Sequence, residues 1–482
     1  MTAPFWGGND TWSDLLPVIH YQKSILEDHQ LPLNTDQWYG GREQWKNPLW
    51  NFLYLPGTLI WLGFPLDWAT RIIFVGHFLF SLYAGWKLAA LYLDNEFQRI
   101  FAAIIFISPN LPAYLAGHVE KILSWGWVLL ALYFLLNPRL SDRKRGLMSG
   151  LCFGVIPLTG SNYYSFFSFI LFIPLLAGIK NKKIIPYFIG GAAIGLLHLP
   201  SVAYLIGVQR ANSLIMIQIS SMNLFGILSS LIVGFALPVS WETWGLVGIG
   251  VGVLFVKLLW LEINEERIKF FRIFDERKAL LTALFILSLF ASGLIYRGNH
   301  LFDTFRVPAR AIFFMALTIL LYCLISNQYE KNKKPLNLTF YLGISAFQII
   351  LLTWLIRPIG SQYSYRDPGV KELTTLLNAD HAKSVWINKQ LPINMNIDVG
   401  LTQQGFQLPN VYYGDMGQKI PVSGNICGYS FDHVITEEDP PVILKPNLEG
   451  ENFSIPLPLE KLELIGRIPV NGEIYKVYRV RC

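Results

Sequence analysis

Charged residues are scarce in this chain of 482 residues. Asp, Glu, Lys and Arg make up 15% of it, whereas soluble domains carry roughly 25%. Hydrophobic residues make up 52%. This deficit excludes an ordinary soluble domain and indicates a chain that lies largely in lipid. The net charge of +6 is small, and the basic residues form short clusters between apolar runs, which is typical of membrane topology and not of a nucleic-acid-binding surface.

Cysteine is also rare, and a leader signal is missing. The four cysteines form no CxxC pair and have no histidine at the spacing of a metal site. Cys152 and Cys323 lie inside apolar runs and are predicted to be buried thiols. Cys427 and Cys482 are interpreted as free thiols, although a disulfide between them stays open if their domain is extracytoplasmic. No removable signal peptide is visible, because the first residues have neither a basic nor an apolar region.

Ten apolar segments follow the first 66 residues, and each approaches the length of a membrane-spanning helix, for which about 20 apolar residues suffice. They are 68–93, 97–115, 121–137, 146–160, 162–179, 184–206, 244–262, 279–296, 306–326 and 338–356. The predicted fold class is therefore mainly α, a polytopic helical membrane protein of roughly ten spans. Because the segment 146–160 contains Gly154 and Pro157, we expect it to be short or broken.

Four basic clusters set the predicted orientation, because Lys and Arg concentrate in cytoplasmic loops. The clusters lie at 139–145, 180–183, 267–278 and 331–334. All four fall on the cytoplasmic side when the ten segments cross in alternation, and both termini then lie outside the cytoplasm. Residues 224–238 would break this alternation as a crossing, so we interpret them as a re-entrant or interfacial segment.

This topology divides the chain into three predicted regions. An extracytoplasmic loop with amphipathic helices covers 1–66, a transmembrane helical domain covers 67–356, and a small β-rich extracytoplasmic domain covers 357–482. The polar residues 1–66 would cross the membrane without a preceding helix. Either the following helix translocates them or a first transmembrane helix is missing before Met1, and we expect the missing helix.

The C-terminal region carries short strand signals. Asn471-Gly472 between two alternating runs predicts a hairpin with a type I′ turn. Weaker patterns predict strands near 384–390, 419–424, 441–446 and 453–458, and a helix is predicted around 369–377.

The loop before the first span is polar, aromatic and acidic, and it is the predicted place of catalysis. Asp10 follows Gly7-Gly8-Asn9, whose mobility lets its carboxylate reach a bound substrate as a general base. The alternative is that Asp10 only caps a helix over 12–28. Trp38 and Tyr39 offer flat faces on which a sugar ring can stack, and their alternative is an aromatic belt at the membrane interface.

His118 and Glu120 lie in AGHVEK, the short outer loop between two predicted spans. A histidine and a glutamate two residues apart can assist proton transfer, orient a substrate hydroxyl or bind a divalent cation. A polar interfacial turn is an equally good interpretation. Two local ligands are few for a metal site, so a divalent cation stays an option and no other cofactor is indicated.

Arg306 and Arg310 in FRVPAR open the span 306–326 on the predicted outer side. Ionisable groups that enter a span are candidates for function, and the guanidinium fork suits bidentate binding of a phosphate or diphosphate. The alternative is that both side chains snorkel to lipid headgroups.

Three stretches together carry a resemblance to a known family. They are GGND…LPVIHYQKSILEDHQLPLNTDQWYGG…NPLWNFLYLP, AGHVEKILSWGWVLLAL and FRVPAR. In these the chain resembles the GT-C-type membrane glycosyltransferases, especially their YfhO-like branch. The first outer loop of that family bears an acidic residue with a catalytic role, and its position in the motif corresponds to Asp10. The pattern TGSNYY around Tyr163 and Tyr164 departs from related sequences, which can have a histidine there.

The resemblance implies a hexosyltransferase in the inner membrane of a prokaryote. It would move a sugar from a polyprenyl-phosphate donor to a glycan, lipid or protein acceptor on the outer face, surrounded by membrane lipid. Asp10 would deprotonate the acceptor hydroxyl, the arginines would stabilise the phosphate leaving group, and the anomeric centre would be inverted. A transporter or flippase of lipid-linked saccharide and a non-catalytic envelope assembly protein are the alternatives.

Overall fold

The computed structural model describes residues 18–35, 42–43, 51–116, 118–200, 221–232, 246–265, 275–296, 308–330, 337–355, 368–387, 432–436, 442–446, 452–456, 459–470 and 473–481. The structural statements that follow concern these residues.

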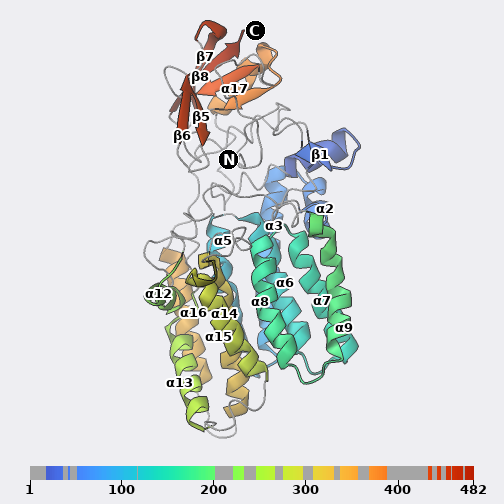
Figure 1. Cartoon of the computed structure of the whole chain (residues 1–482), viewed down its shortest axis with the longest axis vertical. Coiled ribbons are helices and arrows are strands. Elements are labelled where there is room, and N and C mark those ends of the chain that lie inside the picture. Colours follow the sequence, from blue (N-terminus) through green and yellow to red (C-terminus); the bar gives the residue numbers. More distant parts are fainter. Residues whose placement is uncertain are drawn as a thin grey trace.

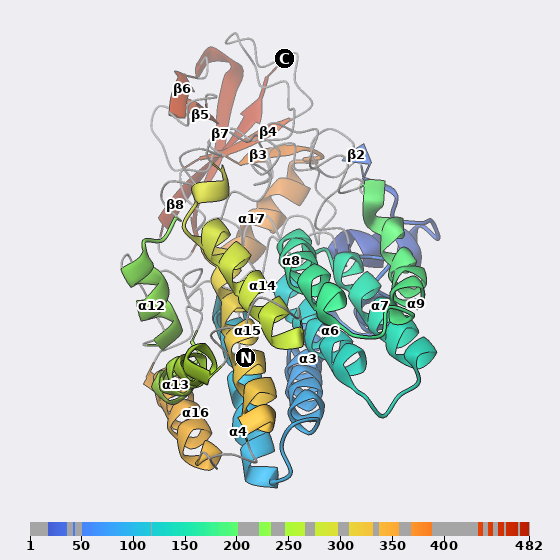
Figure 2. The ribbon, with the colours of Figure 1, turned by 60° about the horizontal axis from the view of Figure 1, so that its bottom comes forward.

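The chain forms a bundle of helices with small sheets beyond one of its ends (Figure 1 and Figure 2). Each of the ten predicted apolar segments coincides with a helix or a run of helices, which confirms the mainly α prediction. The helices are α3 (Leu66–Ala89), α4 (Glu96–Ile107) with η3 (Ser108–Asn110) and α5 (Leu111–Ala116), α6 (Val119–Leu136), α7 (Asp142–Leu158), α8 (Asn162–Gly178), α9 (Ile184–Ala192) with η4 (Ala193–His198), α13 (Ile249–Glu265), α14 (Glu276–Ala291) with η6 (Leu294–Tyr296), η8 (Pro308–Arg310) with α15 (Ala311–Glu330), and α16 (Leu338–Leu355).

Two properties of this bundle are typical of a membrane protein. Three described stretches, Trp68–Ala89, Val119–Leu136 and Ala311–Gln328, are long and apolar enough to cross one. Large apolar side chains also face outward from the bundle, which would be unfavourable in water and needs no cover in lipid. Examples are Leu79, Phe169, Ile189, Val256, Phe285 and Phe347.

The bundle has two ends of different character. α3, α6, α8 and α15 begin at the end that faces the C-terminal sheets (Figure 1), which we call the domain end. The opposite end carries residues 139–145, residues 180–183 and the start of α14, and we call it the basic end. Arg145, Lys180 and Glu276 line one cavity there. Each of them lies within a different one of the four predicted basic clusters, so three of these clusters lie together at the same end, as alternating crossings require.

A shorter helix, α12 (Leu224–Ile232), has nine residues. At a rise of 1.5 Å per residue it is roughly 14 Å long, about half the thickness of the hydrocarbon core. This length agrees with a re-entrant or interfacial segment, although the predicted end of that segment at Pro238 lies outside the described residues.

Glycines bring α7 and α9 into close contact. Gly146, Gly150 and Gly154 recur every four residues along α7, and Gly191 and Gly195 face them. A Cβ atom at Gly146 would lie 2.5 Å from the carbonyl oxygen of Ile184, and one at Gly154 would lie 2.9 Å from that of Ala192. Small residues at such spacing are the usual means by which helices approach each other in a membrane.

Residues 146–160 were predicted to be short or broken, and of these two alternatives the break is wrong. The helix is short, because its 17 residues are fewer than the about 20 that a span needs. α7 is a continuous helix of 17 residues that begins at an N-cap, where the Ser141 hydroxyl accepts a hydrogen bond from the backbone amide of Lys144. Pro157 lies in the last turn, where the helix ends in any case, and Gly154 allows the contact with α9 instead of breaking the helix.

A hydrogen-bonded trio holds the N-terminal region to the bundle. Tyr54, at the N-cap of α2 (Leu55–Gly63), has its hydroxyl 2.7 Å from Nε2 of His77, and Trp127 Nε1 donates to the same hydroxyl at 3.0 Å. Nδ1 of His77 lies 2.9 Å from the carbonyl oxygen of Ile73, and this oxygen can only accept a hydrogen bond. His77 therefore carries its proton on Nδ1 when neutral, and Nε2 accepts from Tyr54.

The C-terminal region holds α17 (Pro368–Ala379) and a four-stranded sheet of order β3-β4-β8-β7. Its strands are β3 (Val385–Ile387), β4 (His433–Thr436), β7 (Leu462–Val470), which follows η11 (Leu459–Lys461), and β8 (Glu473–Val480). Val470 lies opposite Glu473 in the antiparallel pair β7–β8, so two residues connect the strands, as predicted from Asn471-Gly472. The predicted helix around 369–377 corresponds to α17.

Two smaller strand pairs complete the described structure. β5 (Val442–Pro446) pairs with β6 (Asn452–Pro456) at two of the predicted strand positions, and β1 (Asn34–Thr35) pairs with β2 (Arg42–Glu43) near the N-terminus, after the π-helical turn η1 (Lys23–Glu27). β4 was not predicted, and the predicted strand at 419–424 lies outside the described residues. Cys152 and Cys323 are free and buried, as predicted, whereas Cys427 and Cys482 lie outside the described residues.

Candidate functional site

Two charged side chains and a histidine gather where α6 begins, at the domain end. Lys121 is 1% exposed, and its Nζ lies 2.9 Å from Glu120 Oε1. The same oxygen lies 3.8 Å from Nδ1 of His118, the N-cap residue of α6. A carboxylate in the first turn of a helix is favoured by the helix dipole, and a buried ammonium group requires an anionic partner. Glu120 therefore connects His118 and Lys121 in one buried charged group.

A buried amide joins this group to α8. Asn110 is fully buried, and its Oδ1 accepts a hydrogen bond of 2.6 Å from the hydroxyl of Tyr164. Its Nδ2 donates to the carbonyl oxygen of Lys121 at 3.4 Å. Asn110 thus links the end of η3, the first turn of α6 and the first turn of α8 through one side chain.

Arg310 approaches from a fourth element, the short helix η8 before α15. Its guanidinium carbon lies 4.1 Å from the centre of the Tyr163 ring, which is a close cation–π contact. Tyr164, the next residue, lies within electrostatic range of both Arg310 and Glu120. Arg310 and Glu120 are therefore the basic and acidic sides of one polar cluster around Tyr164.

We call His118, Glu120, Lys121, Asn110, Tyr163, Tyr164 and Arg310 the polar cluster. Its members come from α6, η3, α8 and η8, which all meet at the domain end. Aromatic rings close its inner side, because the Tyr164 ring packs edge-on against Trp125 and Phe314 at 5.4 Å in each case. The cluster combines an acid, an imidazole and a guanidinium, which are groups that can recognise a polar or phosphorylated ligand, and its members Asn110, Lys121 and Tyr164 are almost completely buried.

The structure brings together three of the predicted site residues, His118, Glu120 and Arg310. Asp10, Trp38, Tyr39 and Arg306 lie outside the described residues, so their predicted roles stay predictions. Within the described part of the chain, no group of three or more His, Cys, Asp and Glu side chains could hold a metal ion.

Four members of the polar cluster were not predicted as site residues: Asn110, Lys121, Tyr163 and Tyr164. Lys121 had a detectable signal, because it is a lysine at the start of an apolar helix directly after Glu120. Asn110 and Tyr164 are 54 residues apart, and nothing local in either stretch indicates their contact.

A second charged cluster lies in the C-terminal sheet. Both ring nitrogens of buried His433 face carboxylates, with Nε2 2.7 Å from Asp380 and Nδ1 2.8 Å from Asp432. Arg479 bonds to Asp380 and to Glu463. Burial acts to raise the pKa of Asp432, but hydrogen bonds from His433 and from the backbone amides of Lys383 and Ser384 outweigh it and hold that pKa below its usual value. This cluster stabilises the sheet by tying α17, β4, β7 and β8 together.

The fold and the apolar surface define a class, an integral and mainly helical membrane protein with a small C-terminal sheet. A comparison with protein-family models finds no match, and a comparison with curated proteins finds none either. Among solved structures, the whole chain is similar to the arabinofuranosyltransferase AftD from mycobacteria, with a TM-score of 0.51 and 13% sequence identity. The chain spans 40% of the length of that protein. At this identity the similarity concerns the fold.

Proposed function

We propose that the protein is a membrane glycosyltransferase of the GT-C type, which moves a sugar from a polyprenyl-phosphate donor to an acceptor on the extracytoplasmic face. The polar cluster at the domain end is the observation that carries this proposal. It places a guanidinium, a carboxylate and an imidazole at one end of a membrane bundle, where a lipid-linked phosphate and its sugar would arrive. The similarity of fold to an arabinofuranosyltransferase supports the same reaction class.

The proposed reaction assigns a role to each group. Asp10 takes the proton of the acceptor hydroxyl as the oxygen attacks the anomeric carbon, and the bond from that carbon to the phosphate oxygen breaks on the opposite face. Arg306 and Arg310 stabilise the charge that develops on the departing phosphate. His118 and Glu120 bind sugar hydroxyls, and Trp38 and Tyr39 stack on the sugar ring.

The cation–π contact of Arg310 with Tyr163 supports its role. The contact with the ring restricts the guanidinium, and this restriction lowers the ordering cost of bidentate phosphate binding. Lys121 neutralises Glu120 in part, so that the carboxylate can accept a hydroxyl proton in a hydrogen bond without a large local excess of negative charge.

The proposed topology is that of the sequence prediction. Ten spans cross the inner membrane of a prokaryote with the basic end in the cytoplasm. The regions 1–66 and 357–482 and both termini lie outside. In support, the apolar stretches form helices in alternating direction and the C-terminal sheets lie beyond the domain end (Figure 1).

The test uses the full chain reconstituted in vesicles with polyprenyl-phosphate sugars, arabinofuranose and hexoses in turn, and measures transfer to added acceptor. Asp10→Asn should reduce the rate by about 10²- to 10⁴-fold, and Arg310→Gln by about 10²- to 10³-fold. Asp14→Asn in the same loop and Arg143→Gln at the basic end are the matched controls and should keep the rate.

Normal rates in both test variants, with transfer by the unaltered protein, would refute the assigned roles. Loss of transfer in Asp14→Asn but not in Asp10→Asn would move the base to Asp14. Donor movement across the bilayer without any glycosylated product would replace the proposal by a flippase.

A further inference from the structure

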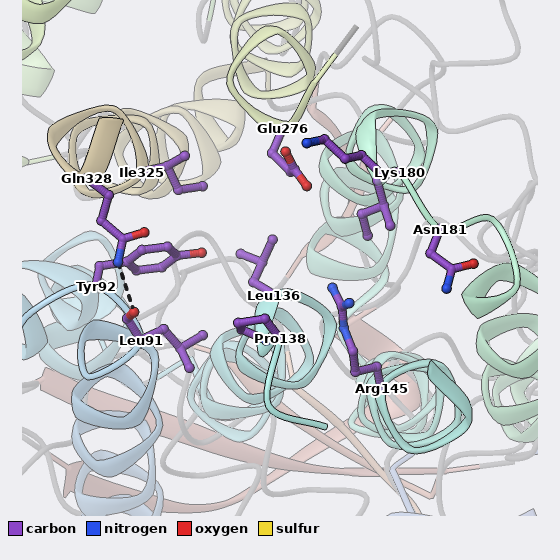
Figure 3. A pocket seen from close by; sticks show the side chains of 11 residues that line it. Leu91, Tyr92, Leu136, Pro138, Arg145, Lys180, Asn181, Glu276, Ile325 and Gln328 are labelled. Carbon is purple, nitrogen blue, oxygen red and sulfur yellow. Dashed lines mark hydrogen bonds between the residues drawn. The ribbon is translucent and has the colours of Figure 1, made fainter. Parts of the chain in front are cut away.

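A cavity of about 510 Å³ opens at the basic end of the bundle, opposite the polar cluster. Figure 3 shows it surrounded by the ends of several helices, and its lining side chains include residues of α7, α14 and α15 and the residues directly after α8. Leu136, Ile179 and Ile325 form apolar parts of its wall, and Arg145, Lys180 and Glu276 are charged groups on it. The cavity is therefore amphipathic, with an apolar side and a charged side.

Arg145 is fixed by the backbone of the neighbouring helix. Its Nε and Nη2 donate to the carbonyl oxygen of Leu135 at 3.1 and 2.7 Å. This bond pair satisfies an end carbonyl of α6 and uses Nε and Nη2 of a guanidinium that lines the cavity (Figure 3). A guanidinium held in this way loses little further freedom when it binds an anion.

The charge around the cavity favours an anion. The described lining residues include two cations, Arg145 and Lys180, and one carboxylate, Glu276. Asp142 also lies within electrostatic range of Arg145, and its carboxylate accepts a hydrogen bond from Asn181, which lines the cavity. Exposed lysines at 144, 182 and 183 add positive potential at the same end.

The position of the cavity selects the kind of anion. Basic pockets between helices at the cytoplasmic side of a membrane lie at the level of the anionic headgroups of that leaflet. An apolar wall next to the cations suits the glycerol and upper acyl part of a lipid, which a small hydrophilic phosphate would leave without contact.

We propose that this cavity binds a phosphate ester, supplied by the phosphodiester headgroup of an anionic membrane phospholipid. Arg145 holds the phosphate through its guanidinium, Lys180 adds a second charge, and Leu136, Ile179 and Ile325 contact the glycerol backbone and the first acyl carbons. The site is separate from the polar cluster, and it does not depend on the proposed glycosyl transfer.

The test measures phospholipid retained by the full chain purified from vesicles of phosphatidylglycerol and phosphatidylcholine, by native mass spectrometry. Arg145→Gln should reduce retained phosphatidylglycerol by about tenfold, the value of one charge-assisted hydrogen bond. Arg143→Gln, with the same charge change on the same helix but outside the cavity, should leave it unchanged. Equal retention in all three proteins, or equal loss in both variants, would overturn the proposal.

Lys180→Gln provides a second test that leaves the Leu135 carbonyl capped. It should reduce retention by about threefold, whereas Lys183→Gln, three residues away and not on the cavity, should not. If Arg145→Gln fails to fold, this pair decides, and equal effects would reject the site. A separate arm adds sn-glycerol 3-phosphate, and Arg145-dependent binding of that ester without any retained phospholipid would overturn the lipid assignment.

Discussion

Adding one methyl group at Gly191 should force α7 and α9 apart. A Cβ atom there would lie 2.5 Å from the carbonyl oxygen of Leu147 and 2.7 Å from the amide nitrogen of Leu151. Ordinary contact begins at 3.4 Å, so the helices must separate by about 0.9 Å, and backbone atoms cannot step aside as a side chain does. Overpacking of this kind costs about 1–3 kcal/mol, of which the better helix propensity of alanine offsets at most about 1 kcal/mol.

The adjacent Gly190 provides the control, because a Cβ atom there meets nothing within 4 Å. Gly190→Ala changes the same helix by the same methyl group and should stabilise the protein by up to about 1 kcal/mol. Unfolding of both variants in mixed micelles, followed by far-ultraviolet circular dichroism, should therefore give free energies of unfolding that differ by about 1–3 kcal/mol, with Gly190→Ala the more stable. Equal changes would refute the argument that backbone contact limits this helix pair.

Two further predictions concern the polar groups. Tyr164→Phe keeps the packed ring but leaves the buried Oδ1 of Asn110 without its donor, so the free energy of unfolding should fall by about 1 kcal/mol; an unchanged value in the same micelle assay would contradict the hydrogen bond. Asp432→Asn should weaken the C-terminal sheet at pH 7, seen as faster hydrogen exchange in β4 than in the unaltered protein. Because the folded-state pKa of Asp432 lies below its usual value, its contribution is complete above the unfolded-state pKa of about 3.9 and disappears as the pH falls through the folded-state value. The difference between the two proteins should close over that acid range, and a difference independent of pH would rule out the carboxylate as its source.

Apolar content determined the main architecture from the sequence alone. A helix in lipid needs a long run of apolar residues, so each of the ten segments could be found without knowledge of its neighbours. The hairpin β7–β8 was equally local, because Asn471-Gly472 favours one turn geometry between two alternating runs. His118 and Glu120 were selected because they lie two residues apart in a short outer loop, and Arg310 because ionisable groups that enter a span are candidates for function.

The side-chain partners were decided by tertiary structure. Gly154 and Pro157 suggested a short or broken segment when α7 was considered by itself. Only the position of α9 showed that Gly154 permits close packing of the two helices. β4 is a four-residue strand whose pairing with β3 and β8 joins segments far apart in the chain, so no local pattern indicates it.

The polar cluster combines both kinds of information. The sequence singled out His118, Glu120 and Arg310 as three separate candidates, each explained equally well by an interfacial turn or by snorkelling. Their meeting around Tyr164 depends on how α6, α8 and α15 pack, which brings residues 110, 164 and 310 together at one end of the bundle. Helix formation is governed by neighbours within about one turn, whereas a site built from four elements depends on long-range packing that periodicity in the sequence does not encode.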